Sequence, residues 1–252
     1  MFIDTHAHIH FEDYRDELDA VLERAATAGV DHIITVGVDD VDSGQAVAVA
    51  RAYNNVYATV GLHPNDADRG YEALEEIQRL TEFESVVGIG ECGLDYYREG
   101  ADRDTQERAL RFQIELAIEH DLPLVFHVRD AFDDFFTILD DYPEARGLVH
   151  CFTAGVREAQ GALDRGLMIA LNGIMTFTKD PAQLEAAKMI PLDSLVLETD
   201  CPFLTPAPRR GQKNEPANVA LTAAFLAELR GESVEDLSVA TTANAKRLFS
   251  IE

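Results

Sequence analysis

The feature that most constrains this fold is a regular alternation of short apolar runs with longer amphipathic segments. The apolar runs are rich in β-branched residues, which is typical of buried parallel strands. We expect these strands at residues 2–8, 31–37, 56–61, 86–91, 123–128, 147–151, 167–172 and 194–199. Helical periodicity is found between and after them, at roughly 13–28, 42–53, 71–81, 102–120, 130–141, 156–165, 180–189, 216–230 and 233–249.

Eight strands that are each followed by a helix predict an α/β fold, a single (β/α)8 TIM barrel. We expect residues 1–252 to form one domain, because neither a linker nor a low-complexity stretch interrupts the pattern. An open doubly wound sheet is the alternative, but it would not require eight regular units.

Ionisable side chains gather at the predicted carboxyl ends of these strands, where the active site of such a barrel lies. Most of the histidines follow this rule, together with Glu91 and Asp200: they are His6, His8, His63, His127 and His150. By contrast, His32 begins a strand and His120 ends a helix, so both are interpreted as structural or solvated, and His10 stays undecided.

The stretch "DTHAH" places two histidines two positions apart at the end of the first strand. Strand side chains alternate between faces, so His6, His8 and Asp4 point the same way. Two core histidines with hydrogen-bond partners would give the same pattern. The further ligands decide against that alternative, because four histidines, a glutamate and an aspartate suit two divalent ions.

The joint order of several motifs resembles the TatD family of metal-dependent hydrolases and deoxyribonucleases, within the amidohydrolase-like barrels. The motifs are "DTHAHIH", "GLHPN", "GIGECGLDYYR", "PLVFHVRDA", "HCFTAG", "NGIMTF", "LETDCPFLTP" and "KNEP". They run from residue 3 to residue 216, which is nearly the whole chain. Each motif alone is weakly specific, whereas their common order and spacing are highly specific.

The resemblance implies that one metal ion is held by His6, His8, Glu91 and Asp200, and a second by Glu91, His127 and His150. Glu91 would bridge the two ions, which could be zinc, magnesium or manganese. We expect Asp200 to act as general base as well as ligand, with pure ligation as the alternative. Glu198 is interpreted either as a partner of a ligand inside the barrel or as half of a buried ion pair.

Candidate substrate-binding residues are His63, Arg129, Arg210, Lys213 and Asn214. The last three lie in the basic loop "RRGQKNEP", in a region where barrels often bind phosphate. Glu215 is interpreted as a structural residue at the start of the next helix. Tyr96 and Tyr97 could stack on a base, but packing of a lid is the favoured interpretation.

Two positions depart from the family pattern without touching a proposed ligand. Relatives often carry a small residue and a glycine directly after "HCF", whereas this chain has Thr153 and Ala154 before Gly155. Gln212 stands where relatives often carry a basic residue. These changes bear on affinity and substrate choice.

The three cysteines, Cys92, Cys151 and Cys201, each follow a candidate ligand directly. Neighbouring residues on a strand face opposite sides, so we expect all three to be small packing residues. An odd number of cysteines does not suggest a disulfide framework.

The formal charge of −25 rests on 46 acidic and 21 basic residues, and only four of the basic residues are lysines. An acidic, lysine-poor surface over an ordinary core suggests a protein adapted to high salt, where self-repulsion is screened. Loss of structure in low-salt buffer is the expected behaviour. Large basic patches are absent, so any nucleic-acid binding must rest on a few local cations and metal ions.

The sequence therefore predicts a two-metal hydrolase that cleaves phosphodiester bonds of DNA, exonucleolytically, at single-stranded or 3′ ends. Another ester such as a D-aminoacyl-tRNA, or a small-molecule lactone or amide, is the alternative within enzymes. A non-catalytic scaffold is the alternative outside them, and the complete ligand set disfavours it. Neither a secretory signal nor a membrane span is expected, so we predict a cytoplasmic protein without an obligate protein partner.

Overall fold

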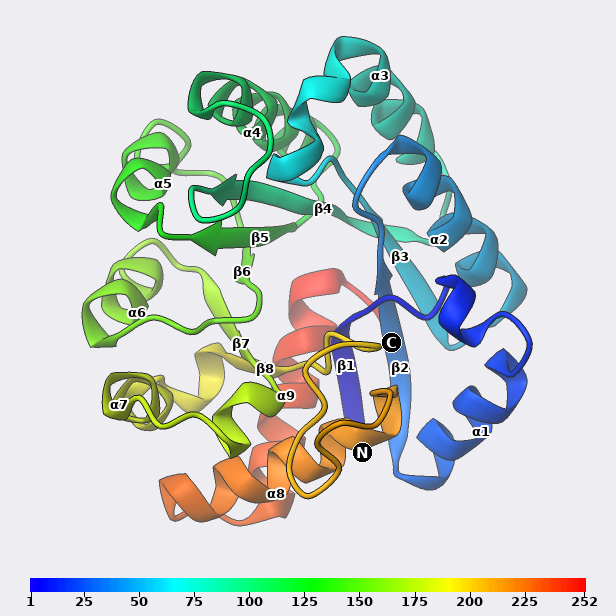
Figure 1. Ribbon diagram of the computed structural model, residues 1–252, viewed down its shortest axis with the longest axis vertical. Coiled ribbons are helices and arrows are strands. Elements are labelled where there is room, and N and C mark those ends of the chain that lie inside the picture. The colour runs from blue at the N-terminus through cyan, green and yellow to red at the C-terminus, as the bar shows by residue number, and fades with distance from the viewer.

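The computed structural model describes residues 1–252 and contains one eight-stranded sheet in which every neighbouring pair of strands is parallel. The strand order follows the chain, with helices on the outside of the ring (Figure 1). The strands are β1 (Phe2–Ala7), β2 (Val30–Val36), β3 (Val56–Val60), β4 (Val86–Asp95), β5 (Leu124–Arg129), β6 (Gly147–Val149), β7 (Met168–Leu171) and β8 (Leu195–Leu197).

The ring closes between β8 and β1 through backbone contacts just beyond the end of β8. Asp200 N donates to His6 O over 2.8 Å, and His8 N donates to Cys201 O over 2.8 Å. Ala7 and Cys201 also form an isolated parallel bridge. These contacts confirm the predicted (β/α)8 barrel and exclude the open doubly wound sheet.

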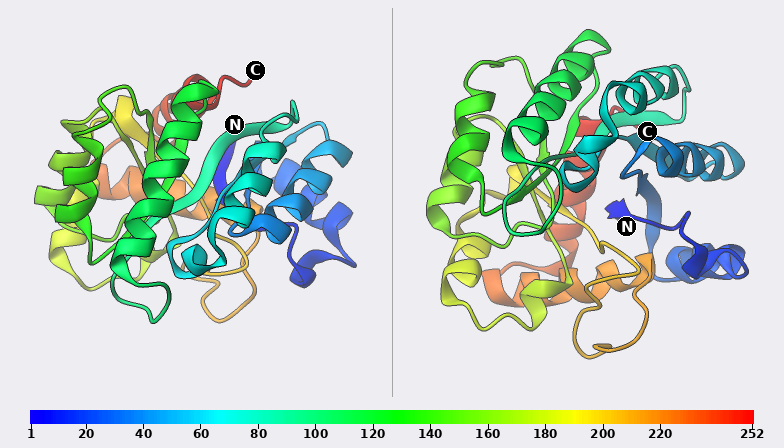
Figure 2. Two further views of the ribbon diagram at one scale, coloured as in Figure 1. Left: turned by 90° about the horizontal axis from the view of Figure 1, so that it is seen from above. Right: turned by 45° about the horizontal axis from the view of Figure 1, so that its top comes forward.

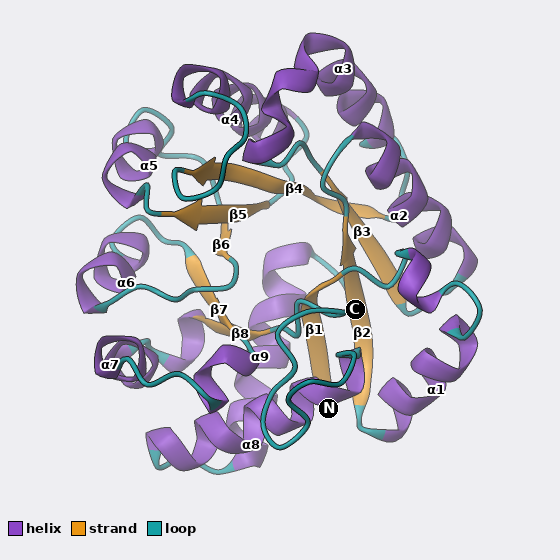
Figure 3. Cartoon of the chain, viewed as in Figure 1, coloured by secondary structure: helices purple, strands orange, loops and turns teal.

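Helices follow the strands in chain order and surround them (Figure 3). They are α1 (Leu18–Thr27), α2 (Asp40–Ala52), α3 (Gly70–Leu80), α4 (Arg103–Glu119), α5 (Phe132–Leu139), α6 (Val156–Leu163), α7 (Pro181–Met189), α8 (Val219–Arg230) and α9 (Val234–Phe249). No helix combines the length and the apolar composition that crossing a bilayer requires.

The predicted helix at 13–28 is wrong at its start, because only a short 3₁₀ turn (Glu12–Tyr14) precedes α1. The Tyr14 side chain is completely buried and its hydroxyl donates to the backbone oxygen of Asn214. This distant contact holds the turn against the loop after β8. Similarly, a 3₁₀ turn at Pro216–Asn218 replaces the first residues of the helix expected at 216–230.

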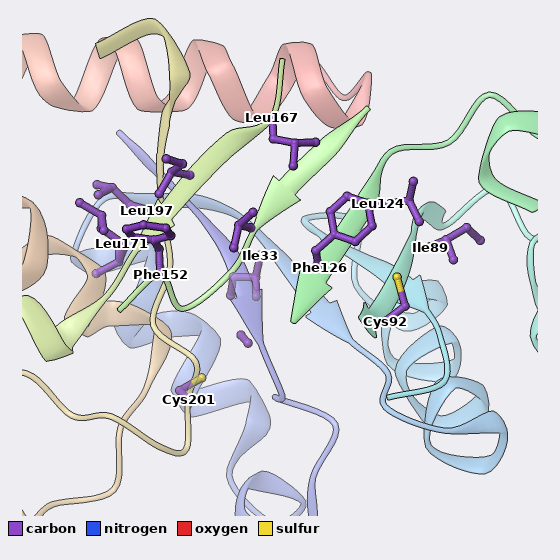
Figure 4. Packing of buried hydrophobic residues seen from close by; sticks show 14 of the residues in the cluster. Ile33, Ile89, Cys92, Leu124, Phe126, Phe152, Leu167, Leu171, Leu197 and Cys201 are labelled. Carbon is purple, nitrogen blue, oxygen red and sulfur yellow. The ribbon is translucent and has the colours of Figure 1, made fainter. Parts of the chain in front are cut away.

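The main hydrophobic core lies between the strands and the outer helices (Figure 4). Cys92 and Cys201 are fully buried among these apolar side chains, which confirms their prediction as packing residues. The same prediction is wrong for Cys151, which is half-buried and lines the cavity described below. β6 ends at Val149, so strand alternation no longer sets the direction of Cys151.

A second apolar cluster fills the opposite end of the barrel, where α9 packs against the strands. Ile34, Val125 and Val196 of the strands pack in this cluster with Leu248 and Phe249, the last two residues of α9. In the left view of Figure 2, α9 lies at one end of the molecule and the loop after β8 at the other. The barrel is therefore sealed at one end and presents its loops at the other.

Candidate metal centre

Six side chains from five strands and the segments that follow them converge inside the open end of the barrel. His6 and His8 come from β1 and its end, and their Nε2 atoms lie 3.3 Å apart. Asp200 Oδ1 lies 3.4 Å from His8 Nε2 and 3.8 Å from His6 Nε2. His6, His8 and Asp200 therefore form one compact group with metal-binding atoms facing a common point.

Glu91 on β4 joins this group to a second one. Its Oε2 lies 3.4 Å from His6 Nε2, while its Oε1 lies 2.8 Å from His127 Nδ1 and 2.9 Å from His150 Nε2. The two oxygens of one carboxylate thus face different sets of histidines. This geometry is the one that a carboxylate bridging two ions requires.

Hydrogen bonds on their outer nitrogens orient two histidines toward the cluster. His8 Nδ1 donates to the carbonyl oxygen of Val36 over 2.8 Å, so Nε2 is the nitrogen that faces the cluster. His127 Nε2 lies 3.2 Å from Asp95 Oδ2, so Nδ1 faces Glu91 in the same way. Partners of this kind fix the tautomer of metal-binding histidines, so the residues fit a metal centre.

The two carboxylates of the cluster are held in the ionised form that metal binding needs. Burial alone would raise the pKa of Glu91, but the charge of His150 and hydrogen bonds from His127 and His150 hold it well below its usual range. Burial likewise opposes ionisation of Asp200, and the hydrogen bond from His8 and the other histidine charges lower its pKa.

His63 follows β3 and lies beside the cluster, with Nε2 3.5 Å from Glu91 Oε1. Burial lowers the pKa of His63 to about 3, so its imidazole is neutral near pH 7. Its Nδ1 accepts from the backbone N–H of Asn65, which places the remaining proton on Nε2. His63 can therefore donate a hydrogen bond from Nε2 to an oxygen in the cavity.

Glu198 lies behind His150 and supports it. Its Oε1 lies 3.7 Å from His150 Nδ1 and accepts hydrogen bonds from Cys151 N and Asn172 Nδ2. No lysine or arginine pairs with this carboxylate, so its position matches the ligand-partner interpretation. Asp4 is also buried, and it accepts from Thr199 N and Oγ1 rather than joining the cluster.

Asp95 contacts the cluster, although the sequence argument did not single it out. The predicted strand stops at Glu91, whereas β4 continues to Asp95 and carries that carboxylate to His127. Gln106 fixes the backbone of Asp95 with hydrogen bonds to its N–H and its carbonyl. The motif "GECGLD" contains this residue, but spacing along one chain does not indicate its partner.

A cavity of about 530 Å³ opens above the cluster. Its floor is formed by cluster residues, including Glu91, His150 and Asp200. Arg98 and Arg129 line it, and neither takes part in an ion pair. A neighbouring groove of about 590 Å³ shares Arg129 and also contains Arg103.

The predicted substrate-binding residues are not all brought to this cavity. Arg129 and His63 line it, whereas Arg210 covers the ring of Phe177, with the guanidinium carbon 3.6 Å from its centroid. Lys213 pairs with Glu17 over 2.5 Å.

Asn214 has a different task from the one expected. It is completely buried, and its Nδ2 donates to Thr199 O and Phe203 O at 3.0 and 2.6 Å. The amide therefore braces the turn that carries Asp200 and has no free donor for a substrate. Glu215 lies directly before the 3₁₀ turn, and it pairs with Arg24 over 2.7 Å, in keeping with a structural role.

The two tyrosines after β4 differ in environment. Tyr96 is half-buried with Arg103 above its ring, while Tyr97 is largely exposed with Arg129 above its ring at 4.3 Å. Neither ring lines the cavity over the cluster. Their packing against arginines agrees better with support of the rim than with direct stacking on a base.

The arrangement can bind divalent cations with neutral imidazoles and carboxylates, next to cations that suit an anionic oxygen. Bound ions of this kind stabilise the developing charge on oxygens during hydrolysis and activate water. The chemistry indicated by the cluster is hydrolysis of a bond to an electron-poor centre. The residues alone do not restrict the substrate to one ester.

Comparisons with known proteins agree with this chemistry. The model of the family described as "TatD related DNase" matches residues 3–250. The Bacillus subtilis protein "Uncharacterized metal-dependent hydrolase YabD" is 42% identical over the whole length of both chains. A Salmonella typhimurium relative named "3'-5' ssDNA/RNA exonuclease TatD" is 35% identical, with 94% of this chain and 95% of the relative covered.

A solved structure gives the same result in three dimensions. The crystal structure of YjjV, a TatD homologue from Escherichia coli, superimposes with a TM-score of 0.91 at 32% identity. The match covers all of this chain and 98% of the other. With its barrel, its histidine and carboxylate cluster and these relatives, the chain belongs to the TatD family of metal-dependent hydrolases.

Proposed function

We propose that this protein hydrolyses phosphodiester bonds of single-stranded DNA, and removes nucleotides from an end, with two divalent ions. The observation that carries the proposal is the bridging geometry of Glu91, whose two oxygens face separate histidine groups beneath a cavity with unpaired arginines. Two ions a few ångströms apart suit displacement at phosphorus, since attacking and leaving oxygens are both stabilised.

The ligands divide around Glu91. His6, His8 and Asp200 would hold one ion with Glu91 Oε2, and His127 and His150 would hold the other with Oε1. The identity of the ions is left to experiment, since mixed imidazole and carboxylate ligands accept zinc, manganese and magnesium.

Asp200 is the residue proposed to take the proton of the attacking water. Its Oδ1 faces His8, and the lowered pKa keeps the carboxylate ionised as an acceptor at neutral pH. Asn214 braces the backbone around Asp200, so the carboxylate is held in place before substrate arrives.

Arg98 and Arg129 are proposed to bind the non-bridging phosphate oxygens, with His63 Nε2 as a neutral donor beside them. In a chain of charge −25, arginines without carboxylate partners stand out, and these two line the cavity. Charge-assisted bonds from arginine to phosphate are among the strongest in proteins. This local cationic wall favours a phosphate-bearing substrate over a neutral lactone or amide.

The test is hydrolysis of a 5′-labelled single-stranded oligonucleotide by metal-free protein with magnesium, manganese or zinc added, in low-salt buffer and in molar KCl. Stepwise shortening that requires metal and is blocked by EDTA is the expected result. Asp200→Asn serves as the inactive variant, and Asp16→Asn serves as the control because that aspartate is exposed and does not belong to the ligand cluster.

An intact oligonucleotide after incubation with folded, metal-loaded protein would contradict the proposal. Circular dichroism and metal analysis of the same sample establish that the protein is folded and loaded. Aminoacyl-tRNA and small esters would then be the next substrates to assay. Cleavage of internal bonds only would support the proposed nuclease activity and contradict the proposed removal of nucleotides from an end.

A further inference from the structure

One wall of the cavity over the metal centre is aromatic and apolar, in contrast to its ionic floor. Phe11 and Phe203 form this wall, with ring centroids 6.4 Å apart in an edge-to-face arrangement. Phe11 stacks on His8, with ring centroids 4.8 Å apart and planes 16° from parallel. The wall is therefore continuous with the metal-binding residues.

Phe203 is unusual because it is 52% exposed although it lies inside a cavity. The other exposed aromatic side chains are Tyr71, Phe83 and Tyr97, and none of them lines this cavity. Exposing a phenylalanine forgoes the free energy of burying its ring. A ring kept exposed beside a reaction centre has a surface available for a ligand.

The backbone of Phe203 is fixed relative to Asp200. Phe203 N donates to Asp200 O over 2.9 Å, and Phe203 O accepts from Asn214 Nδ2 over 2.6 Å. The turn that positions the proposed general base therefore also positions the ring. Such preorganisation lowers the ordering cost of binding.

We propose that Phe203, supported by Phe11, stacks on the nucleobase of the terminal nucleotide while its phosphate lies over the metal centre. This inference rests on the proposed nuclease function and adds a base subsite to it. An ionic floor, a cationic wall with Arg129 and an aromatic wall match the phosphate and base of one nucleotide. Aromatic rings stack on any base, so the subsite accepts all four.

Stacking on Phe203 requires a base whose face is free, so the subsite selects unpaired ends. A terminal base within a duplex stacks on its neighbour and pairs with its partner, and both contacts must break before it reaches the ring. We therefore expect single-stranded ends to be cleaved faster than blunt duplex ends. Replacement of Phe203 by a small residue should reduce this difference.

The decisive experiment compares two oligonucleotides, one normal and one with an abasic terminal nucleotide, as substrates of each variant. Phe203→Ala should lower kcat/KM for the normal oligonucleotide by roughly tenfold, in the range found for base stacking. Its effect on the abasic substrate should be less than about twofold, since the contact is already missing. Phe203→Tyr should restore the preference for a base.

Phe83→Ala is the matched control, because Phe83 is exposed but packs under Arg51 away from the cavity. Equal losses on normal and abasic substrates by Phe203→Ala would overturn the base subsite while leaving the nuclease intact. A wild-type protein that cleaves no oligonucleotide would overturn the proposed function and this inference together.

Discussion

The two ends of the barrel interior are built from neighbouring positions on the same strands, yet they serve opposite purposes. On β5, β6 and the β8 segment, an apolar residue is followed two positions later by a polar one: Val125 by His127, Leu148 by His150, and Val196 by Glu198. The apolar members join the cluster under α9. The polar members lie at the metal centre.

Along each of these strands, the earlier residue stabilises the fold and the later residue contributes to the candidate site. The apolar end removes hydrocarbon from water and contributes free energy of folding. The other end buries ionisable groups, and His6 Nδ1, His150 Nδ1 and Glu198 Oε2 have no hydrogen-bond partner there. Burying such atoms opposes folding, which is the cost of a prepared cation site.

The largest expected effect on activity comes from the polar end. Asp200→Asn removes a ligand charge and the proposed proton acceptor, so hydrolysis should fall by roughly 10²- to 10⁴-fold, as for loss of a general base. In metal-free buffer the free energy of unfolding should change little, or rise, because a buried charge is removed. Initial rates and urea titrations of the variant and of Asp16→Asn measure the two quantities. A strongly destabilised Asp200→Asn protein would contradict the claim that the polar end of the barrel serves activity rather than stability.

The apolar end should show the reverse behaviour. Phe249 is 2% exposed in the cluster under α9, so Phe249→Ala leaves a cavity and should lower the free energy of unfolding by about 3–5 kcal/mol. Activity per folded molecule should stay near the wild-type value at low temperature. Urea denaturation and active-site titration with metal test both statements. Loss of activity in a fully folded Phe249→Ala protein would contradict the comparison.

Metal removal should destabilise the protein through the polar end alone. An ion that binds only the folded state at 100 times its Kd stabilises it by about 2.7 kcal/mol. EDTA should therefore lower the free energy of unfolding by a similar amount in wild type and in Phe249→Ala, because the sites are independent. Thermal unfolding with and without chelator measures the shift, and an unchanged wild-type midpoint would argue against a structural contribution of the ions.

Asp95 should act through His127 rather than on substrate. Asp95→Asn weakens the acceptor that keeps the His127 proton on Nε2, so metal affinity or activity should fall roughly 10- to 100-fold. Isothermal titration with zinc gives the affinity directly. Asp66→Asn is a suitable control, since Asp66 lines the same cavity without contacting His127. Equal metal affinities for Asp95→Asn and wild type would contradict a role of Asp95 in metal binding through His127.

The smallest effect is expected for Lys213, which the sequence assigned to substrate and the structure pairs with Glu17. Lys213→Ala should leave the stability almost unchanged, because exposed ion pairs are screened by solvent. Its kcat/KM should fall much less than that of Arg129→Ala, whose guanidinium lines the cavity. A larger loss of kcat/KM for Lys213→Ala than for Arg129→Ala would indicate that the basic loop binds substrate after all.

The comparison also explains how much could be predicted from the sequence. The strands, the helices and the positions of His6, His127 and His150 at strand ends follow from local periodicity, since strand and helix repeats are properties of neighbouring residues. The predicted helix bounds were wrong where distant contacts intervene, as at Tyr14, whose hydroxyl donates to the backbone oxygen of Asn214. The prediction that Cys151 is a packing residue was wrong because β6 ends before it.

The barrel and the set of candidate metal-binding side chains could be predicted from the sequence, because residue types at regular spacing indicate both. The contacts of the remaining polar residues became known only from the folded structure. Asn214 braces the turn of Asp200, Lys213 faces Glu17, and Asp95 reaches His127. Such partners lie up to about 200 positions away and meet only after the loops have packed, so no local pattern records them.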